Sequence, residues 1–567
     1  MAFRTVLKAV AVSLLALQVA APVQAQGVAG SYLAARHASL FSDFRAAANY
    51  YAQAIVADPR NPALLENGVM AYLSLGEGDR AATVARRLIQ TGTTSQIAHM
   101  ALLADGFKRE SYDTLIEDID AGMSVGPLVD GLLKAWALMG QGQMSEALVS
   151  FDEVANTQGI EIFGLYHKAL ALALVGDYEG SAGIFSGETD GPLQLTRRGI
   201  LAYIQVLSQL ERNPDAVELL DSSFGENLDP YLVELRAELA AGKPIAFDAL
   251  TSPIDGAAEV FLVVAGALNG EANDNYTLLY ARTAEYLRPD HVDAILLTAA
   301  LLESLERHQL ATETYAKIPS DDPAFNAAEL GRADALRQSG DVDGAIEVLR
   351  GLAEAEPDNP EIHITLGDTL RREERYDEAS QSYDAAIALI EEPTRANWLV
   401  YFARAITHER MDRWELAEAD FRFSLELNPG QPSVLNYLGY SFVEMGINLD
   451  EALAMIEEAV AAEPNSGYIV DSLGWVQYRL GDYAEAVVNL ERATELMAVD
   501  PIVNDHLGDA YWAVGRKIEA EFQWKRALSF DPEEEDAARI RRKLEVGLDV
   551  VLEEEGAAPL KVHAQDG

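Results

Sequence analysis

Alanine recurs every 34 residues along most of this 567-residue chain, and this period constrains the fold more than any other feature. A large side chain follows four residues later and a small one seven later, as in Ala379-Tyr383-Ala386. A fixed period of about 20 to 50 residues is typical of a solenoid, in which stacked units share a continuous core. We therefore expect a long surface instead of one pocket. The clearest alanines are Ala311, Ala345, Ala379, Ala452, Ala486 and Ala520.

The signals between these alanines predict paired helices. Gly-Asp turns recur at Gly176-Asp177, Gly340-Asp341 and Gly481-Asp482. A glycine can close one helix in the left-handed conformation, and an aspartate can cap the next. No alternating strand pattern of comparable length occurs. The sequence therefore predicts an all-α chain of helical hairpins.

Apolar-Gly pairs about 12 residues before the alanines complete a motif that resembles the tetratricopeptide repeat (TPR) family, over roughly Tyr32 to Phe530. The resemblance implies a right-handed superhelical solenoid of antiparallel helix pairs, whose first helices line the concave face. It also implies that the chain holds a peptide or protein partner and has no catalytic activity. The pairs are Leu366-Gly367, Leu438-Gly439, Leu473-Gly474 and Leu507-Gly508.

The last units carry a more specific resemblance, in the segments Asp471 to Trp475 and His506 to Trp512. They are similar to the end of exported bacterial TPR adaptors, some of which are lipoproteins that present cell-wall hydrolases to a periplasmic carboxyl-terminal processing protease. This resemblance implies an envelope protease or cell-wall enzyme as partner. The chain has no cysteine, so it lacks the lipidated cysteine of the anchored members. The absence of cysteine also excludes disulfides and thiolate catalysis.

The N-terminal residues predict export. Arg4 and Lys8 precede a mostly apolar run from Ala9 to Val19, and Val23-Gln24-Ala25 supplies small residues at a cleavage-type site. The run is shorter than the roughly 20 residues that span a bilayer, so it resembles a secretory signal peptide. We expect a periplasmic protein without an integral membrane segment.

The period is uneven, and this unevenness predicts the domain organisation. It is clean after Asn326, eroded earlier and weakest around residues 222 to 256. A terminal helix with an apolar stripe and a polar face that includes Lys543 is expected to close the solenoid. The predicted parts are a signal peptide (1–25), a partly degenerate solenoid (26–221), an irregular joint (222–256), a second solenoid (257–532), a capping helix (533–556) and a disordered tail (557–567).

The charge excludes one class of partner. The chain has 43 basic and 91 acidic residues, a net charge of −48. Nucleic-acid binders neutralise phosphates with Lys and Arg, so nucleic acid is not an expected partner. The carboxylates either keep a long protein soluble or select basic segments on a partner.

Helical spacing selects the residues that would project into the concave groove of the second solenoid. Aromatic side chains there offer contact area and hold cations, and carboxylates accept hydrogen bonds or pair with arginine. For Trp475 and Trp512, packing between repeats is an equally good interpretation, whereas Trp524 and Phe421 are expected in the core. An acidic wall also argues against the lysine-lined clamps that hold chaperone tails. The predicted groove residues are Asp368, Arg371, Asn436, Tyr440, Asp471, Trp475, Tyr478, Asp505, Asp509 and Trp512.

No motif predicts catalysis, a cofactor or a metal. The nine histidines lack metal-ligand spacing, and there is no phosphate-binding glycine loop or nucleophile elbow. The first hypothesis is a non-catalytic scaffold or adaptor in envelope proteolysis or cell-wall remodelling. The second is a structural subunit of a secretion, polysaccharide-export or outer-membrane assembly. An enzyme remains only if the joint at 222–256 contains a site.

Overall fold

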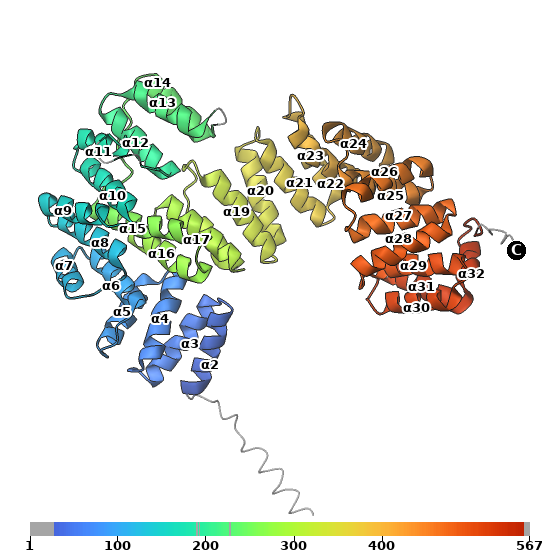
Figure 1. Ribbon diagram of the computed structural model, residues 1–567, viewed down its shortest axis with the longest axis horizontal. Helices are drawn as coiled ribbons and strands as arrows, with labels where there is room; N and C mark the ends of the chain where they lie inside the picture. Colours follow the sequence, from blue (N-terminus) through green and yellow to red (C-terminus); the bar gives the residue numbers. More distant parts are fainter. Residues whose placement is uncertain (1–27, 189–190, 192, 226–227, 561–567) are drawn as a thin grey trace, which may run out of the picture. The chain divides into compact units, whose positions relative to one another are not determined.

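The computed structural model describes residues 28–188, 191, 193–225 and 228–560 (Figure 1). The predicted signal peptide and residues 561–567 of the predicted tail lie outside the described residues. Within the described part, all regular elements are helices and no strand occurs. The chain divides into two compact units, 1–348 and 349–567. The predicted joint at 222–256 falls inside the first unit.

The helices of the first unit follow one another as hairpins with short connections. The last of them, α20, crosses the boundary between the units. The bounds are α2 (Val28–Leu40), α3 (Phe44–Ala57), α4 (Pro62–Leu75), α5 (Gly78–Ile89), α6 (Gln96–Lys108), α7 (Tyr112–Asp120), α8 (Pro127–Gly140), α9 (Met144–Ala155), α10 (Glu161–Leu174), α11 (Tyr178–Phe185), α12 (Arg197–Gln209), α13 (Asn213–Phe224), α14 (Pro230–Ala240), α15 (Pro253–Leu268), α16 (Asp274–Leu287), α17 (Val292–Ser304), α18 (His308–Tyr315), α19 (Phe325–Gln338) and α20 (Val342–Ala355).

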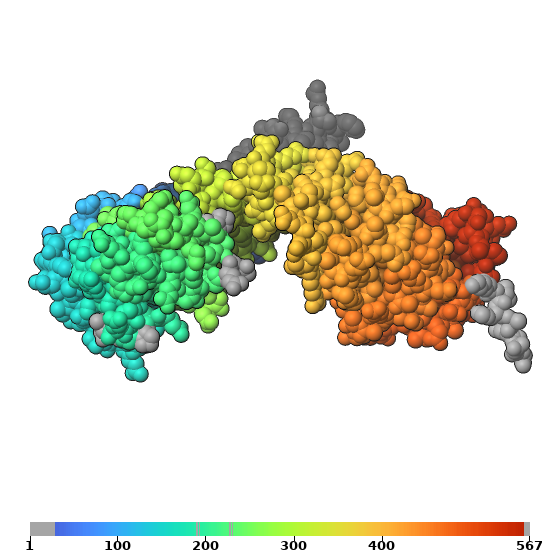
Figure 2. Space-filling view, turned by 90° about the horizontal axis from the view of Figure 1, so that it is seen from above, coloured from blue at the N-terminus to red at the C-terminus, as the bar shows by residue number. Residues whose placement is uncertain are grey.

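The second unit continues with the same alternation of first and second helices. Side chains close the space between its successive hairpins (Figure 2). The bounds are α21 (Pro360–Arg372), α22 (Tyr376–Ala388), η1 (Arg395–Asn397), α23 (Trp398–Arg410), α24 (Trp414–Leu427), α25 (Pro432–Met445), α26 (Leu449–Ala462), α27 (Gly467–Leu480), α28 (Tyr483–Leu496), α29 (Pro501–Ala513), α30 (Lys517–Leu528), α31 (Glu534–Val546) and α32 (Leu548–Glu554).

Small residues bring the two helices of each hairpin together. A Cβ placed on Gly367 would lie 2.6 Å from the Tyr383 ring, and one on Gly508 would lie 2.4 Å from the Trp524 ring. Real Cβ atoms do not approach this closely, so only glycine fits against these rings. The alanines that set the period are buried, among them Ala379. The predicted all-α TPR-type solenoid of helix pairs is confirmed.

The turns follow the predicted chemistry in part. Gly176 and Gly481 adopt positive φ angles of 84° and 97°, which glycine tolerates. The Asp177 carboxylate accepts a hydrogen bond from the Gly180 N–H at 3.0 Å, so it caps the next helix. Asp482 makes no such bond with its side chain. The glycine signal was therefore more dependable than the aspartate signal.

The inner face of the first unit is filled by its own chain. Helix α15 packs against α6, α8 and α10, and α16 packs against α4 and α6, which are first helices of the preceding hairpins (Figure 1). Gly256 allows the closest approach, since a Cβ there would lie 2.3 Å from the Trp136 ring. Phe261 and Ala265 are fully buried in the same core. The predicted sequence boundary at 257 thus separates helices that form a single core.

A buried carboxylate joins four helices of this unit. Glu259 on α15 accepts hydrogen bonds from the Tyr166 hydroxyl on α10 at 2.8 Å and from Arg198 Nε on α12 at 2.7 Å. His291 Nε2, at the start of α17, lies 3.5 Å from the same carboxylate. Burial opposes ionisation, but Arg198 and His291 together hold the pKa of Glu259 well below its usual range. This network links α15 to α10 and α12 through buried side chains.

The C-terminal cap consists of two helices where one was predicted. Gly547, with a φ of 88°, ends α31 and starts the turn into α32. Ile540 on α31 and Leu548 and Val551 on α32 are buried, as the apolar stripe predicts. Within the described residues, no helix has both the length and the hydrophobicity required to cross a bilayer.

Candidate partner-binding site

The predicted groove residues all lie on first helices of the second unit: α21, α25, α27 and α29. On α21, Asp368 directly follows Gly367, and the Tyr383 hydroxyl donates a 2.7 Å hydrogen bond to its carboxylate. Arg371 Nε donates to the same hydroxyl at 3.2 Å. Burial and the neighbouring Asp368 raise the pKa of Tyr383 strongly. Asp368 and Arg371 are half-buried, and both help to hold the ring that packs on Gly367.

Asp509 on α29 repeats this arrangement. It directly follows Gly508, and Trp524 Nε1 donates a 2.9 Å hydrogen bond to its carboxylate. The carboxylate after the glycine therefore satisfies the polar atom of the aromatic ring that packs there. Asp509 is only 1 % exposed.

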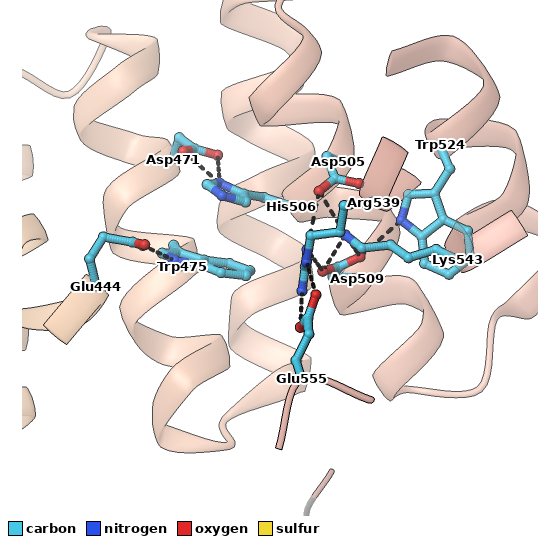
Figure 3. Close-up of polar contacts among 10 residues, drawn as sticks. All are labelled: Glu444, Asp471, Trp475, Asp505, His506, Asp509, Trp524, Arg539, Lys543 and Glu555. Carbon is cyan, nitrogen blue, oxygen red and sulfur yellow. Dashed lines mark hydrogen bonds and ion pairs between the residues drawn. The ribbon is translucent and has the colours of Figure 1, made fainter. Parts of the chain in front are cut away.

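A lysine from the last hairpin neutralises the acidic side chains of α29 (Figure 3). Lys543 Nζ on α31 lies 2.7 Å from Asp505 Oδ2 and 2.7 Å from Asp509 Oδ1. Its side chain is 0 % exposed, so the predicted placement of Lys543 on a polar outer face was wrong. Burial raises the pKa of Asp505, and Lys543 offsets this only in part. Arg539 lies 3.6 Å from Asp509 and pairs with Glu555 at 2.8 Å.

A second set of polar contacts joins α25, α27 and α29. His506 Nδ1 lies 2.9 Å from Asp471, and its ring stacks on Trp475 with centroids 4.0 Å apart and planes 11° apart. Trp475 Nε1 donates to Glu444 at 2.8 Å, and the Tyr478 ring stacks on Trp475 with centroids 4.8 Å apart. Burial disfavours the imidazolium, but Asp471 outweighs it and raises the pKa of His506.

The structure therefore brings most of the predicted residues of α27 and α29 together. Their side chains contact other residues of the same chain and are not exposed in a groove. Asp471, Trp475, Tyr478 and Asp505 are buried. Trp512 is half-buried, and its Nε1 donates to Asp549 on α32 at 2.9 Å.

Sequence reasoning missed the partners in these contacts. Lys543 follows Asp509 by one 34-residue period, so the two occupy equivalent positions in consecutive hairpins. That register was the available signal, because first helices of neighbouring repeats lie side by side. No sequence signal we used pointed to His506 as the partner of Asp471.

The first helices α23 and α25 present a more open face. Leu399 is 52 % exposed at the start of α23, and Tyr468 is 48 % exposed at the start of α27. Between them, four half-buried apolar and aromatic side chains rest on the core: Phe402, Ile406, Tyr437 and Tyr440.

Carboxylates border these rings. The Tyr437 hydroxyl donates to Glu409 at 3.3 Å, and burial together with Glu409 raises the pKa of Tyr437 to about 12. Glu444, at the end of α25, is exposed and holds Trp475. Asn436 is buried, so it adds no accessible acceptor to this face. The face thus combines apolar area with acceptor groups, a combination suited to apolar and basic side chains of a partner.

Three segments of the chain match the tetratricopeptide repeat family, at residues 32–95, 330–393 and 441–496. These segments, about a third of the chain, are similar to tetratricopeptide repeats. Repeats of this kind imply protein partners. Among the described residues, no group of three or more His, Cys, Asp or Glu side chains is placed to hold a metal ion.

Two relatives match part of the chain. A TPR repeat-containing protein of Pseudomonas aeruginosa is 28 % identical over 201 residues, which are 35 % of this chain and 33 % of that protein. The human aspartyl/asparaginyl beta-hydroxylase is 26 % identical over 202 residues, which are 34 % of this chain and 26 % of the hydroxylase. The chain therefore spans a third or less of the length of these relatives.

Two solved structures are similar over most of the chain. The Cut9–Hcn1 hetero-tetramer of the APC/C covers 90 % of this chain and 95 % of its own, with a TM-score of 0.37 and 15 % identity. Yeast Tom70 covers 94 % and 99 %, with a TM-score of 0.30 and 13 % identity.

Proposed function

We propose that this chain is an exported, non-catalytic scaffold that binds an extended protein segment on the face of α23, α25 and the start of α27. The observation that carries the proposal is the row of accessible apolar and aromatic side chains from Leu399 to Tyr468. Sparse carboxylates along this row favour a segment with alternating apolar and basic residues.

The buried contacts of α27 and α29 support this position of the site. To bind a partner, Asp505 and Asp509 would have to exchange Lys543 for a new cation. Removing one member of a buried ion pair costs about 3 to 5 kcal/mol, which few single contacts recover. The proposed site therefore lies on α23, α25 and only the start of α27, where no buried ion pair has to be broken.

The biological setting of the scaffold is also a proposal. The signal-like N-terminus supports a periplasmic location. The resemblance of the last repeats supports an adaptor role in envelope proteolysis or cell-wall remodelling, with an envelope protease or cell-wall enzyme as partner. An envelope assembly that co-purifies in fixed stoichiometry would instead identify the chain as a structural subunit.

Selection from a random displayed 12-residue peptide library on the purified protein tests the site. We expect enriched peptides with Lys or Arg between apolar residues, and Leu399→Glu with Tyr440→Ala should weaken their binding at least tenfold. Ile518→Glu is the matched control, because Ile518 is an 86 % exposed apolar residue on α30. Acidic peptides, or binding that only the control weakens, would contradict the proposal.

A further inference from the structure

The outer faces of the first and last hairpins differ in chemistry. At the C-terminus, α31 presents Arg541 paired with Glu534 and Arg542 paired with Glu554. This polar outer face is what a terminal repeat needs to stay soluble. In the first unit, α2, the first helix among the described residues, does not meet this requirement.

Helix α2 buries one face and exposes a second apolar one. Ala35 and Ala38 pack into the core, whereas Leu33 is 66 % exposed and Leu40 is 79 % exposed. Phe41, just after the helix, is also exposed. The exposed positions Ala29, Leu33, Arg36 and Leu40 follow one another at spacings of 4, 3 and 4 residues. This spacing is the seam by which two helices pack along their length.

The charge around this seam points to the identity of the occupant. Residues 28–50 contain Arg36, Asp43 and Arg45, and Arg45 pairs with Glu313 at 2.5 Å, so the surroundings of the seam are close to neutral in a chain whose net charge is −48. A second copy that docks here meets little of the repulsion that two such acidic chains generally exert.

The seam is also complementary to itself. In an antiparallel pair centred between Leu33 and Arg36, Ala29 lies opposite Leu40 of the second copy, so a small residue faces a large one. Leu33 lies opposite the aliphatic stem of Arg36, whose guanidinium stays in water and is 3.4 Å from the Tyr32 hydroxyl. A two-fold contact of this kind is the commonest arrangement of homo-oligomers.

We propose that two copies of this chain associate through antiparallel pairing of their α2 helices along Ala29, Leu33, Arg36 and Leu40. The pairing covers the exposed apolar face of α2 and does not involve the proposed partner-binding face of the second unit. It stands independently of the function proposed above.

Single-cysteine variants test the register, because the chain has no cysteine of its own. Chains with Ala29→Cys and chains with Leu40→Cys, both starting at Gln26, are mixed and mildly oxidised. Antiparallel pairing predicts disulfide-linked dimers in the mixture. It predicts none from either variant alone, because identical positions are then about 16 Å apart along the pair. Linkage in each variant alone indicates a parallel pair and overturns the proposal.

Sedimentation equilibrium tests the association itself. The unmodified chain from Gln26 should have twice the monomer mass at micromolar concentration. Leu33→Glu with Leu40→Glu should raise the dissociation constant by about 100-fold or more, because leucines of both copies lose their buried position. Melting temperature confirms that this variant folds, and Ile518→Glu, at another highly exposed apolar site, should remain dimeric. A monomeric unmodified chain, or dissociation by the control alone, overturns the proposal.

Discussion

The two units both bury ionised side chains, but they place them between different kinds of neighbours. In the first unit, Glu259 is held by Tyr166 and Arg198, which lie 93 and 61 residues away on helices that surround α15. In the second unit, Lys543 meets Asp509, which lies 34 residues away in the preceding hairpin. The first arrangement ties a filled inner face together, whereas the second ties successive repeats in line.

This difference determines where a partner can bind. In the first unit, α15 and α16 already occupy the face that first helices present, and their apolar side chains are part of the core. In the second unit, the last repeats use their polar side chains on one another, and α23 and α25 keep apolar side chains accessible. In the first unit, the face of the first helices is therefore covered by the chain itself. In the second unit, this face is accessible at α23 and α25 and is occupied by internal contacts at α27 and α29.

The largest effect should come from removing the carboxylate of the first unit. Glu259→Ala leaves Arg198 and the Tyr166 hydroxyl without their buried acceptor, so this unit should lose about 5 kcal/mol of unfolding free energy. Hydrogen exchange read on peptides of α10, α12 and α15 should report the loss, with the second unit unchanged. Glu313→Ala is the control, since its pair with Arg45 is half-exposed and contributes under about 1 kcal/mol. Unchanged exchange in α15 would show that the network does not hold this helix.

A somewhat smaller loss is expected in the second unit. Lys543→Met removes the hydrogen-bonded cation of Asp505 and Asp509 and leaves only Arg539, 3.7 and 3.6 Å away, so α29 to α32 should lose about 3 kcal/mol. Lys525→Met, an exposed lysine paired with Glu521, should change stability by less than about 0.5 kcal/mol. Exchange rates of α29 peptides distinguish the two variants. Equal behaviour would mean that the lysine is not needed to keep the repeats together.

The sequence predicted the parts of this comparison that recur with the period. Ala379 and Ala520 indicated the helix contacts, and the fold of the hairpins followed from them. The site was predicted less well. Spacing alone placed Asp509 on a first helix, but it did not show that Lys543 pairs with this carboxylate. The sequence did not predict that α15 and α16 cover the inner face of the first unit. Glu259 meets Tyr166 only after α15 returns onto α10, and no period relates these positions.

The stability contributions of His167 in the first unit and His506 in the second should have opposite pH dependence and change on opposite sides of pH 6.5. Burial lowers the pKa of His167 to about 4, and Glu259 also has a lowered pKa, so the first unit loses stability as the pH falls below about 6.5. The pKa values of His506 and Asp505 are raised, so their contribution is present at low pH and is lost as the pH rises through the folded values. From pH 6.5 to about 5, His167 alone should cost the first unit about 2 kcal/mol.

Hydrogen exchange at about pH 5, 6.5 and 8, corrected for the intrinsic rate, measures both units, because the His167 contribution changes below pH 6.5 and the His506 contribution changes above it. His167→Phe should remove much of the acid sensitivity of the first unit, and His506→Phe should remove the alkaline sensitivity of the second. If His167→Phe leaves the acid sensitivity of the first unit unchanged, or His506→Phe leaves the alkaline sensitivity of the second unchanged, these two histidines do not account for the pH dependence.

The smallest effect is expected at Asp368. Asp368→Ala removes the acceptor of the Tyr383 hydroxyl, but Arg371 and water remain beside it, so the loss should be about 1 kcal/mol. Thermal denaturation of Asp368→Ala and Asp368→Asn compares loss of the acceptor with loss of the charge. If Asp368→Asn is as unstable as Asp368→Ala, the charge matters more than the hydrogen bond.

The most direct test of the central claim is where a bound peptide protects the second unit. A library-selected peptide with basic and apolar residues should be added at saturation, and hydrogen exchange should be followed across α21 to α32. We predict slower exchange in α23, α25 and the start of α27, with α29 and α31 unchanged. Protection confined to α29 and α31 would show that the partner displaces Lys543, and it would contradict the account.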